Sequence, residues 1–396
     1  MTRLLHLLLR RMPIGWLQLT HNRMRLVAAV AGIAFANLLV FVQLGVVASM
    51  SNVIHLAFTP FSADIIISPP SPQLFGGALL SRRIVYMALA DPGVAAATPL
   101  HLGNMEWKRP AGMSKDLIVY GMAPEASAFA GETISARQLA VLALPNRVLL
   151  DSAFQNIEQA TNEVAFAPMS PETPLEFEIN GHGVSAVGSF SLGSGFGYDG
   201  ALFMSDQTFQ RLVPERTSGT LSHVLVRLKP GADPDTVVRR LTADLAEEHV
   251  QARTIAQTIA DDVKYMNTEA PMGVIFGIGV FIGIFVGLVI VYQVLATDVA
   301  AHMKEYATFK AMGYPHRFLL GIVFEEALII AFLGFVPGAL LGAGVYAVMG
   351  AATGLPLGMT AARAVVVLIG TFAACMISGT LATLRLRGAE PAELFG

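Results

Sequence analysis

The stretch Gly273–Ala296, GVIFGIGVFIGIFVGLVIVYQVLA, holds no charged side chain in 24 consecutive positions. A transmembrane α-helix needs about 20 predominantly apolar residues, because the hydrocarbon core of a bilayer is about 30 Å thick. This stretch therefore predicts a helix that crosses a membrane. The rest of the composition agrees, since 54% of the 396 residues are hydrophobic and only 14% are charged, which is unlike an ordinary soluble protein.

Three further stretches meet the same requirement, so we predict four transmembrane helices, at residues 26–50, 272–296, 318–349 and 363–384. The first follows several arginines, as the apolar region of a signal peptide does. Its apolar core is too long for a signal peptide, however, and no Ala-x-Ala-like cleavage site follows closely, so we expect it to be retained.

The distribution of Lys and Arg predicts the orientation of these spans. Residues 1–25 carry five arginines and no acidic residue, which by the positive-inside rule places the N-terminus in the cytoplasm, as an amphipathic segment at the membrane surface. Four crossings then return the tail, 385–396, to the cytoplasm. Residues 297–317 lie on the same side, whereas the short uncharged loop 350–362 lies outside.

Residues 51–271 are more polar and are punctuated by Pro and Gly, so we predict an α+β extracytoplasmic domain inserted between helices 1 and 2. Strands are expected in ADIIISPP (63–70) and KDLIVYGMAP (115–124), and a helix in SRRIVYMALADPGV (81–94). The segment 221–248 repeats the order of strand, turn and helix. We therefore expect the two ends of the insert to meet in one layer.

This inserted domain is acidic, with 15 Lys plus Arg against 23 Asp plus Glu. An excess of negative charge disfavours binding to nucleic acid. Glycines between residues 184 and 205 lack both the Walker pattern and the dinucleotide-binding spacing, so we interpret them as loop residues of a β-rich region.

No pattern predicts an active site. Three histidines of the inserted domain, His182, His223 and His249, have no second ligand at metal-binding spacing, so structural or solvated roles are expected. Adjacent carboxylates such as Asp261 and Asp262 are interpreted as solvated. We therefore predict that the chain is not an enzyme and has no catalytic, cofactor-binding or metal-binding residues. Its one cysteine, Cys375, has no partner in the chain for a disulfide.

Small residues recur at four-residue intervals in the predicted spans. Such rows let helix backbones approach closely, either within one protomer or at a seam between two protomers, and both alternatives remain open. The glycines concerned are Gly32, Gly279, Gly283, Gly287, Gly334, Gly338 and Gly342.

Two acidic residues, Glu325 and Glu326, lie about two turns into the third span. A charge is costly there unless it faces protein or reaches the interface. We favour a structural contact at the membrane interface, and an ion pathway is the alternative. Pro337 in the same span is expected to kink the helix.

The segment TDVAAHMKEYATFKAMGYPHRF (297–318) is polar yet carries a row of apolar and aromatic residues. As a helix it would place Met303, Tyr306 and Lys310 on one face, and Gly313 would end it. Periodicity leaves two alternatives, a connector on the membrane surface or a projection that a cytosolic partner binds.

Three stretches resemble one family. VYQVLATDVAAHMKEYATFKAMGYPHRFLLGIVFEEALIIAFLGFVPG is similar to the region of the second and third spans of DevC-type permeases, a branch of the MacB/FtsX/LolC superfamily of ABC transporter membrane subunits. The start GWLQLTHNRMRLVAAVAGIAFANLLVFVQLG and the end SGTLATLRLRGAEPAELF also resemble this family. The resemblance covers essentially the whole chain.

The resemblance implies a homodimeric four-span permease in the bacterial inner membrane, working with a DevA-like ATPase that binds ATP and Mg. It also implies that the segment after the second span couples to this ATPase. Glu326 and Ala327 match an acid-alanine pair of the family, whereas Asn37 stands where many relatives carry an acid. The coupling residues would be Asp298, His302, Met303, Glu305, Tyr306, Lys310, Met312, Gly313 and Tyr314.

We expect the docking face to carry Met303, Tyr306 and Lys310, with 312–314 as its tip. The resemblance further implies a DevB-like membrane-fusion adaptor and a TolC-like outer-membrane duct, with ATPase motion passing through the membrane to the external domain. The spans agree with this, since they lack the polar lining that a hydrophilic substrate needs. An FtsX-like signalling scaffold, which activates an external enzyme without transport, is the alternative.

Overall fold

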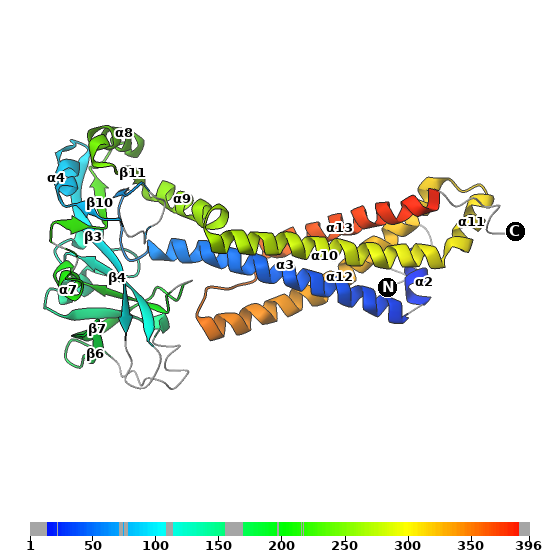
Figure 1. Ribbon diagram of the computed structural model, residues 1–396, viewed down its shortest axis with the longest axis horizontal. Helices are drawn as coiled ribbons and strands as arrows, with labels where there is room; N and C mark the ends of the chain where they lie inside the picture. Colours follow the sequence, from blue (N-terminus) through cyan, green and yellow to red (C-terminus); the bar gives the residue numbers. More distant parts are fainter. Residues whose placement is uncertain are drawn as a thin grey trace. The chain divides into compact units, whose positions relative to one another are not determined.

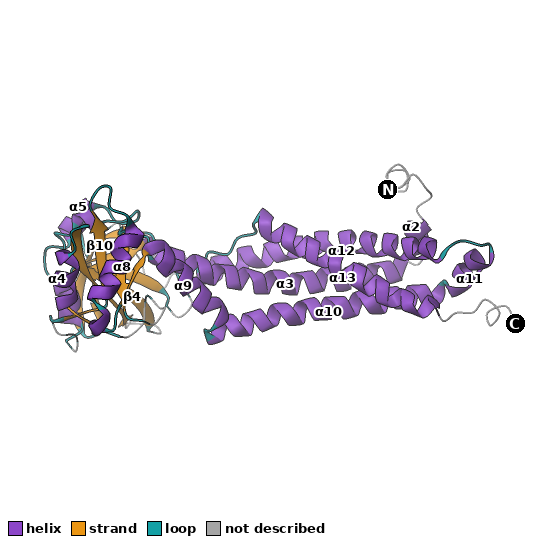
Figure 2. Cartoon of the chain, turned by 90° about the horizontal axis from the view of Figure 1, so that it is seen from above, coloured by secondary structure: helices purple, strands orange, loops and turns teal. Residues whose placement is uncertain are grey.

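The computed structural model describes residues 14–21, 23–70, 74, 78–107, 114–154, 169–195, 198–214, 216 and 218–387. It divides into two compact units. The helix unit comprises Met1–Val47, Val274–Val348 and Leu357–Gly396, and the sheet unit comprises Ala48–Gly273 and Met349–Pro356. Figure 2 shows that the strands belong to one unit and the long helices to the other.

Four long helices run side by side in the helix unit (Figures 1 and 2). They are α3 (Arg23–Ala57), α10 (Pro271–Ala301), α12 (His316–Thr353) and α13 (Ala361–Arg387). Two shorter helices belong to the same unit: α2 (Ile14–His21) precedes α3, and α11 (Met303–Ala311) lies between α10 and α12. Each long helix is long and apolar enough to cross a membrane. The prediction of four apolar helices is confirmed, and the observed helices extend past the predicted spans because helical hydrogen bonding continues into the polar flanks.

Glycines of α3, α10 and α12 lie where α3 packs against the other two helices. A β-carbon added at these positions would fall within about 3 Å of a neighbouring helix of the same chain. The facing pairs are Gly32 with Ile290, Gly279 with Gln43, Gly283 with Val40, Gly287 with Ala36, Gly334 with Ile33, Gly338 with Asn37 and Gly342 with Phe41. These glycines therefore pack against helices of the same protomer, and a seam between two protomers stays a prediction.

The sheet unit contains a nine-stranded mixed sheet in the order β11-β1-β10-β3-β4-β8-β5-β7-β6. The pairs β4/β8 and β5/β7 are parallel and all other pairs of this sheet are antiparallel. The strands are β1 (Ile65–Ser68), β3 (Val94–Trp107), β4 (Lys115–Met122), β5 (Arg147–Asp151), β6 (Leu175–Ile179), β7 (His182–Phe190), β8 (Gly200–Met204), β10 (His223–Leu228) and β11 (Gln251–Thr254), and β2 (Leu80–Ser81) pairs separately with β9 (Thr220–Leu221).

Helices cover the sheet, and β1 is consequently buried on both faces. Ile66 belongs to the apolar cluster on one face, and Ile65 and Ile67 belong to the cluster on the other. A strand covered on both sides reads as a continuous apolar run, which explains the sequence III. The helices of this unit are α4 (Arg83–Ala90), η1 (Ser127–Phe129), α5 (Ala136–Val141), α7 (Asp206–Leu212), α8 (Pro234–Asp244), η2 (Ala246–Glu248) and α9 (Ile255–Thr268).

The strands predicted at 63–70 and 115–124 correspond to β1 and β4. β1 pairs with β10 and β11, so the two ends of the insert meet in one sheet, as predicted. The glycine-containing run 184–205 is only partly a loop, because β7 and β8 take up its two ends.

The prediction of a solvated Asp262 is wrong. Its carboxylate is buried and accepts a hydrogen bond of 3.0 Å from the backbone N–H of Leu74. His223 is also buried, and its Nε2 donates to the Leu74 carbonyl at 2.7 Å. The two side chains thus satisfy both the N–H and the carbonyl of Leu74. This is the structural role expected for the histidine.

Candidate coupling site

Residues 297–317, which we call the coupling segment, form two helical pieces rather than one helix. α10 continues to Ala301, the chain turns at His302, and α11 begins at Met303. The segment is therefore not one unbroken helix, although Met303, Tyr306 and Lys310 of the predicted face all lie within α11. In Figure 1 α11 lies near the end of the helix unit where α2 also lies.

The turn from α11 to α12 is closed by a Schellman motif. Gly313 has φ of +87°, its N–H donates to the Lys310 carbonyl at 3.1 Å, and the Tyr314 N–H donates to the Phe309 carbonyl at 3.1 Å. The ring of Tyr314 also packs edge-on against Phe309, with centroids 5.7 Å apart, and lies 4.7 Å from the ring of Phe318. Both hydrogen bonds and the apolar contact that accompany this motif are present, so the tip has a defined shape.

One face of α11 is buried in the helix unit. Tyr306 is 1% exposed and belongs to an apolar cluster with Leu19 of α2, Val299 of α10 and Ile322 of α12. Tyr306 therefore cannot be part of a docking face in this structure, which corrects the expectation for that residue. The aromatic ring anchors α11 because burial of a large side chain contributes several kcal/mol.

The exposed residues of the coupling segment include its tip, residues 312–314. Met312 is 59% exposed and Tyr314 is 44% exposed, and Lys304, Glu305 and Lys310 are exposed as well. An apolar side chain this accessible in a hydrogen-bonded turn is a suitable contact for a partner protein.

Polar contacts connect the coupling segment to the first two helices. Arg25 Nη1 of α3 lies 3.7 Å from Asp298 Oδ1 of α10, and the Nδ1 atom of His302 lies 3.5 Å from Asp298 Oδ2. Gln18 Nε2 of α2 donates to Glu305 Oε2 of α11 at 3.0 Å. These contacts join four helices at one end of the unit. A cavity of about 290 Å³ lies among them.

The two acids of α12 are buried. Glu326 is fully buried and Glu325 nearly so. A β-carbon on Gly15 would lie 2.9 Å from Glu326 Cγ and 3.1 Å from the Ile322 carbonyl, so α2 packs closely on α12. α2 is therefore partly buried rather than simply resting on a membrane surface. Residues 1–13, where the rest of the amphipathic segment was predicted, lie outside the described residues, as does the tail beyond residue 387.

The sequence analysis did not predict the polar contacts that Gln18 and Arg25 make with the coupling segment. The opposite charges of Arg25 and Asp298 were visible, and both lie at predicted cytoplasmic ends of spans. Their pairing required knowing that α3 and α10 are neighbours. No group of three His, Cys, Asp or Glu side chains within the described residues could hold a metal ion.

Replacing Tyr306 by Phe is expected to leave the stability of the helix unit unchanged or to raise it by up to about 1 kcal/mol. The Tyr306 hydroxyl is buried without a hydrogen-bond partner among the described residues, and burial raises its pKa, so the substitution removes an unsatisfied polar group. Stability is measured by heating the protein with a thiol-reactive fluorophore, because Cys375 is the only cysteine and is buried.

Tyr346 to Phe is the matched control. Its hydroxyl donates a hydrogen bond to the Phe41 carbonyl, so this variant should lose about 1 kcal/mol. Equal losses in the two variants would contradict the assignment of an unpaired hydroxyl at Tyr306.

The fold and this site define a class: a multi-pass membrane protein with a large α/β domain inserted after its first apolar helix. Two family descriptions match the sequence, "MacB-like periplasmic core domain" over residues 26–244 and "FtsX-like permease C-terminal" over residues 277–391. The first covers more than half of the chain. The chain therefore belongs to the MacB/FtsX-type permease family. No curated protein matches it.

Three solved structures are similar to about half of the chain. They are the extracellular domain of the noncanonic ABC-type transporter YknZ from Gram-positive bacteria (11% identity, 48% of this chain and 98% of that chain, TM-score 0.33), the periplasmic region of MacB from Actinobacillus actinomycetemcomitans (12%, 50% and 93%, 0.34), and a domain of a permease-like protein from Porphyromonas gingivalis (12%, 50% and 90%, 0.31). TM-scores this low carry no structural argument, so the family assignment rests on the sequence matches.

Proposed function

We propose that this chain is the membrane subunit of an ATP-driven ABC export complex in a bacterial inner membrane, with both termini in the cytoplasm. MacB/FtsX-type permeases generally work with an ABC ATPase. The proposed complex contains two copies of this chain and a DevA-like ATPase, which binds ATP and Mg. The chain itself has no catalytic role.

The observation that carries the proposal is the construction of the coupling segment. Its tip is exposed at Met312 and Tyr314, whereas its back is fixed in the helix unit through Tyr306. A partner that moves the tip must also move the helices around Tyr306, because close-packed side chains transmit displacement instead of absorbing it. This is the property required of a coupling element between an ATPase and a membrane subunit.

The proposed route of transmission begins at the polar contacts of Asp298 and Glu305, which connect the coupling segment to α2 and α3. α3 is one continuous helix from Arg23 to Ala57, so displacement of its first turns can pass along it. The motion would reach the inserted domain, which in this proposal works with a DevB-like adaptor and a TolC-like duct. Cargo would not pass between the apolar helices.

Replacing Met312 by Glu tests the docking tip. Burying a new carboxylate in a partner interface without a counter-charge is unfavourable, so recovery of the ABC ATPase with a tagged chain should fall by at least about tenfold. The measurement is quantitative mass spectrometry of the complex purified from its native membranes, together with its ATP turnover. Met24 to Glu, at another exposed methionine of the helix unit, is the control and should retain the ATPase.

Each result separates the alternatives. If the unmodified chain recovers no ABC ATPase, the proposed function is wrong. If the Met312 variant retains both the ATPase and its turnover, the docking tip is wrong. Recovery of an external hydrolase without an adaptor, with unchanged export in a deletion strain, would identify the FtsX-like scaffold instead.

A further inference from the structure

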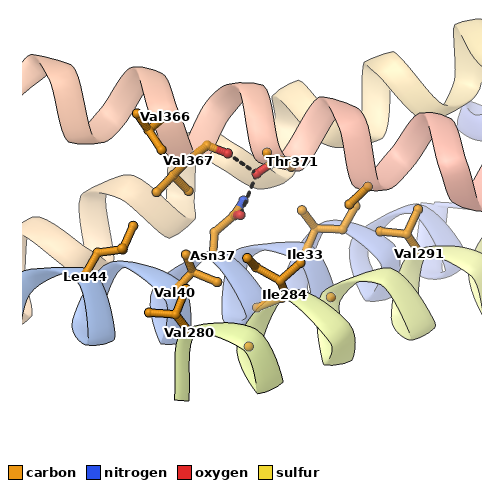
Figure 3. A pocket seen from close by; sticks show the side chains of 15 residues that line it. Ile33, Asn37, Val40, Leu44, Val280, Ile284, Val291, Val366, Val367 and Thr371 are labelled. Carbon is orange, nitrogen blue, oxygen red and sulfur yellow. Dashed lines mark hydrogen bonds between the residues drawn. The ribbon is translucent and has the colours of Figure 1, made fainter. Parts of the chain in front are cut away.

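A cavity of about 190 Å³ lies between α3, α10 and α13 of the helix unit and opens at its surface beside Ile284 and Gly370 (Figure 3). Its walls are almost entirely apolar, with Ile33 and Val40 from α3, Ile284 from α10 and Val367 from α13. An engineered apolar cavity of about 150 Å³ in another protein is large enough to bind benzene. The cavity can therefore hold a molecule of at least one ring.

Small residues make this space. Gly283 and Gly287 of α10 and Gly370 of α13 line the cavity. A β-carbon at Gly283 would touch Val40, whereas one at Gly370 would meet nothing within 4 Å. Helix packing therefore accounts for Gly283 but not for the open space at Gly370.

One polar pair faces the cavity. Asn37 is 5% exposed, and Thr371 Oγ1 lies 2.7 Å both from Asn37 Oδ1 and from the Val367 carbonyl oxygen (Figure 3). Asn37 Nδ2 has no hydrogen-bond partner among the described residues.

The side-chain amide of Asn37 retains a free donor whichever way it is oriented. As placed, its oxygen accepts from Thr371 and both of its N–H groups are unpaired. If the amide is turned over, one N–H donates to Thr371 and the second N–H remains free, because an amide nitrogen carries two hydrogens. An unpaired N–H in an apolar site costs about 1–3 kcal/mol.

Water does not suit this donor. A buried water makes about three hydrogen bonds, whereas the described residues of the walls offer only two polar side chains, Asn37 and Thr371, and Thr371 Oγ1 is already engaged by Asn37 Oδ1 and the Val367 carbonyl. Phospholipid does not suit it either. Asn37 lies about 20 Å along α3 from Arg23, well inside a hydrocarbon core about 30 Å thick, where acyl chains carry no acceptor.

We propose that this cavity binds a small lipophilic molecule of one to three rings, and that a carbonyl oxygen of this ligand accepts a hydrogen bond from Asn37 Nδ2. The apolar walls hold the body of the ligand, and the amide fixes its orientation, as is usual for small-molecule sites. The ligand enters sideways from the bilayer, because Ile284 and Gly370 lie at the surface of the helix unit. This site does not depend on an ATPase partner.

The test uses the full chain in lipid nanodiscs with benzophenone, an aromatic ketone that attaches to nearby C–H bonds on irradiation. Peptide mass spectrometry should locate the attachment on residues 33–44, 280–291 and 366–374, which contain the cavity walls. Fluorenone should compete about tenfold better than fluorene, which has a similar shape but no carbonyl oxygen.

Three variants make the test specific. Gly370 to Leu fills the cavity and should abolish the attachment there, whereas Gly344 to Leu, on α12 and equally free of contacts, should not change it. Asn37 to Leu should remove the preference for fluorenone over fluorene. The thiol reactivity of Cys375 verifies that each variant is folded.

Attachment that is spread over lipid-facing peptides and insensitive to Gly370 to Leu would overturn the proposal, as would a preference for fluorenone that persists in Asn37 to Leu. Absence of attachment in the cavity, together with an inter-chain disulfide formed by Ile284 to Cys in the Cys375 to Ala background, would assign the space to a second copy of the chain and also overturn it.

Discussion

Replacing Gly338 by Leu is expected to lower the stability of the helix unit by about 3 kcal/mol, at the upper end of the cost of overpacking. A β-carbon at Gly338 would lie 2.8 Å from Asn37 Cβ and 2.9 Å from the Ala34 carbonyl oxygen. The second contact is with backbone, so rotation of a side chain cannot relieve it, and α3 and α12 must separate. The dispersion contacts along both helices weaken as a result.

Gly344 to Leu is the control for this prediction. It makes the same change in the same helix, but a β-carbon there meets nothing within 4 Å. Its effect should be neutral or slightly stabilising, since Leu favours a helix more than Gly does. The temperature at which Cys375 becomes reactive measures both variants. Equal behaviour of the two would show that α3 and α12 do not approach closely at Gly338.

The second large effect concerns pH and the buried pair Asp262 and His223 in the sheet unit. Burial raises the pKa of Asp262 to about 6 and lowers the pKa of His223 to about 4. The ordinary pKa values are 3.8 and 6.5. Arg253 also faces both groups and lowers both pKa values, but by less than the dominant effect of burial on each.

The two shifts act in opposite directions between pH 4 and 6.5. Asp262 binds its proton more tightly in the folded chain, so its contribution is present below pH 3.8 and is lost as the pH rises through about 6. His223 binds its proton less tightly in the folded chain, so its contribution is present above pH 6.5 and is lost as the pH falls through about 4. Each contribution changes the free energy of unfolding by about 3 kcal/mol. Because the two changes have opposite signs, they nearly cancel between pH 4 and 6.5.

Single substitutions should reveal the hidden contributions. Relative to the unmodified protein, the free energy of unfolding of Asp262 to Asn should rise by about 3 kcal/mol from pH 4 to 6.5, and that of His223 to Gln should fall by a similar amount. Unfolding by denaturant is followed through Trp107, which is buried in the sheet unit, in a Trp16 to Phe background that leaves no other tryptophan. Slopes of the same sign in both variants would contradict the assigned pKa shifts.

The four apolar helices and their order were readable from the sequence, because a bilayer demands about 20 apolar residues in a row whatever the neighbours are. The strands β1 and β4, the turn after α4 and the C-terminal glycine of α11 were also readable. These features depend on local rules: period, proline and glycine chemistry, and helix capping.

Only the tertiary structure decided which faces meet. In the structure, Tyr306 is buried in the helix unit and the glycine rows pack where α3 meets its neighbours. Asp262 is buried and bonded to the Leu74 N–H, and Asn37 pairs with Thr371. Each of these depends on residues distant in the chain, and an amphipathic pattern indicates that a face is covered without indicating by what. The sequence by itself determined four membrane-spanning helices with an inserted domain of strands and helices, and its resemblance to a permease family. Contacts between distant helices decided which side of the coupling segment is free and where the cavity lies, because packing depends on volumes that no single segment contains.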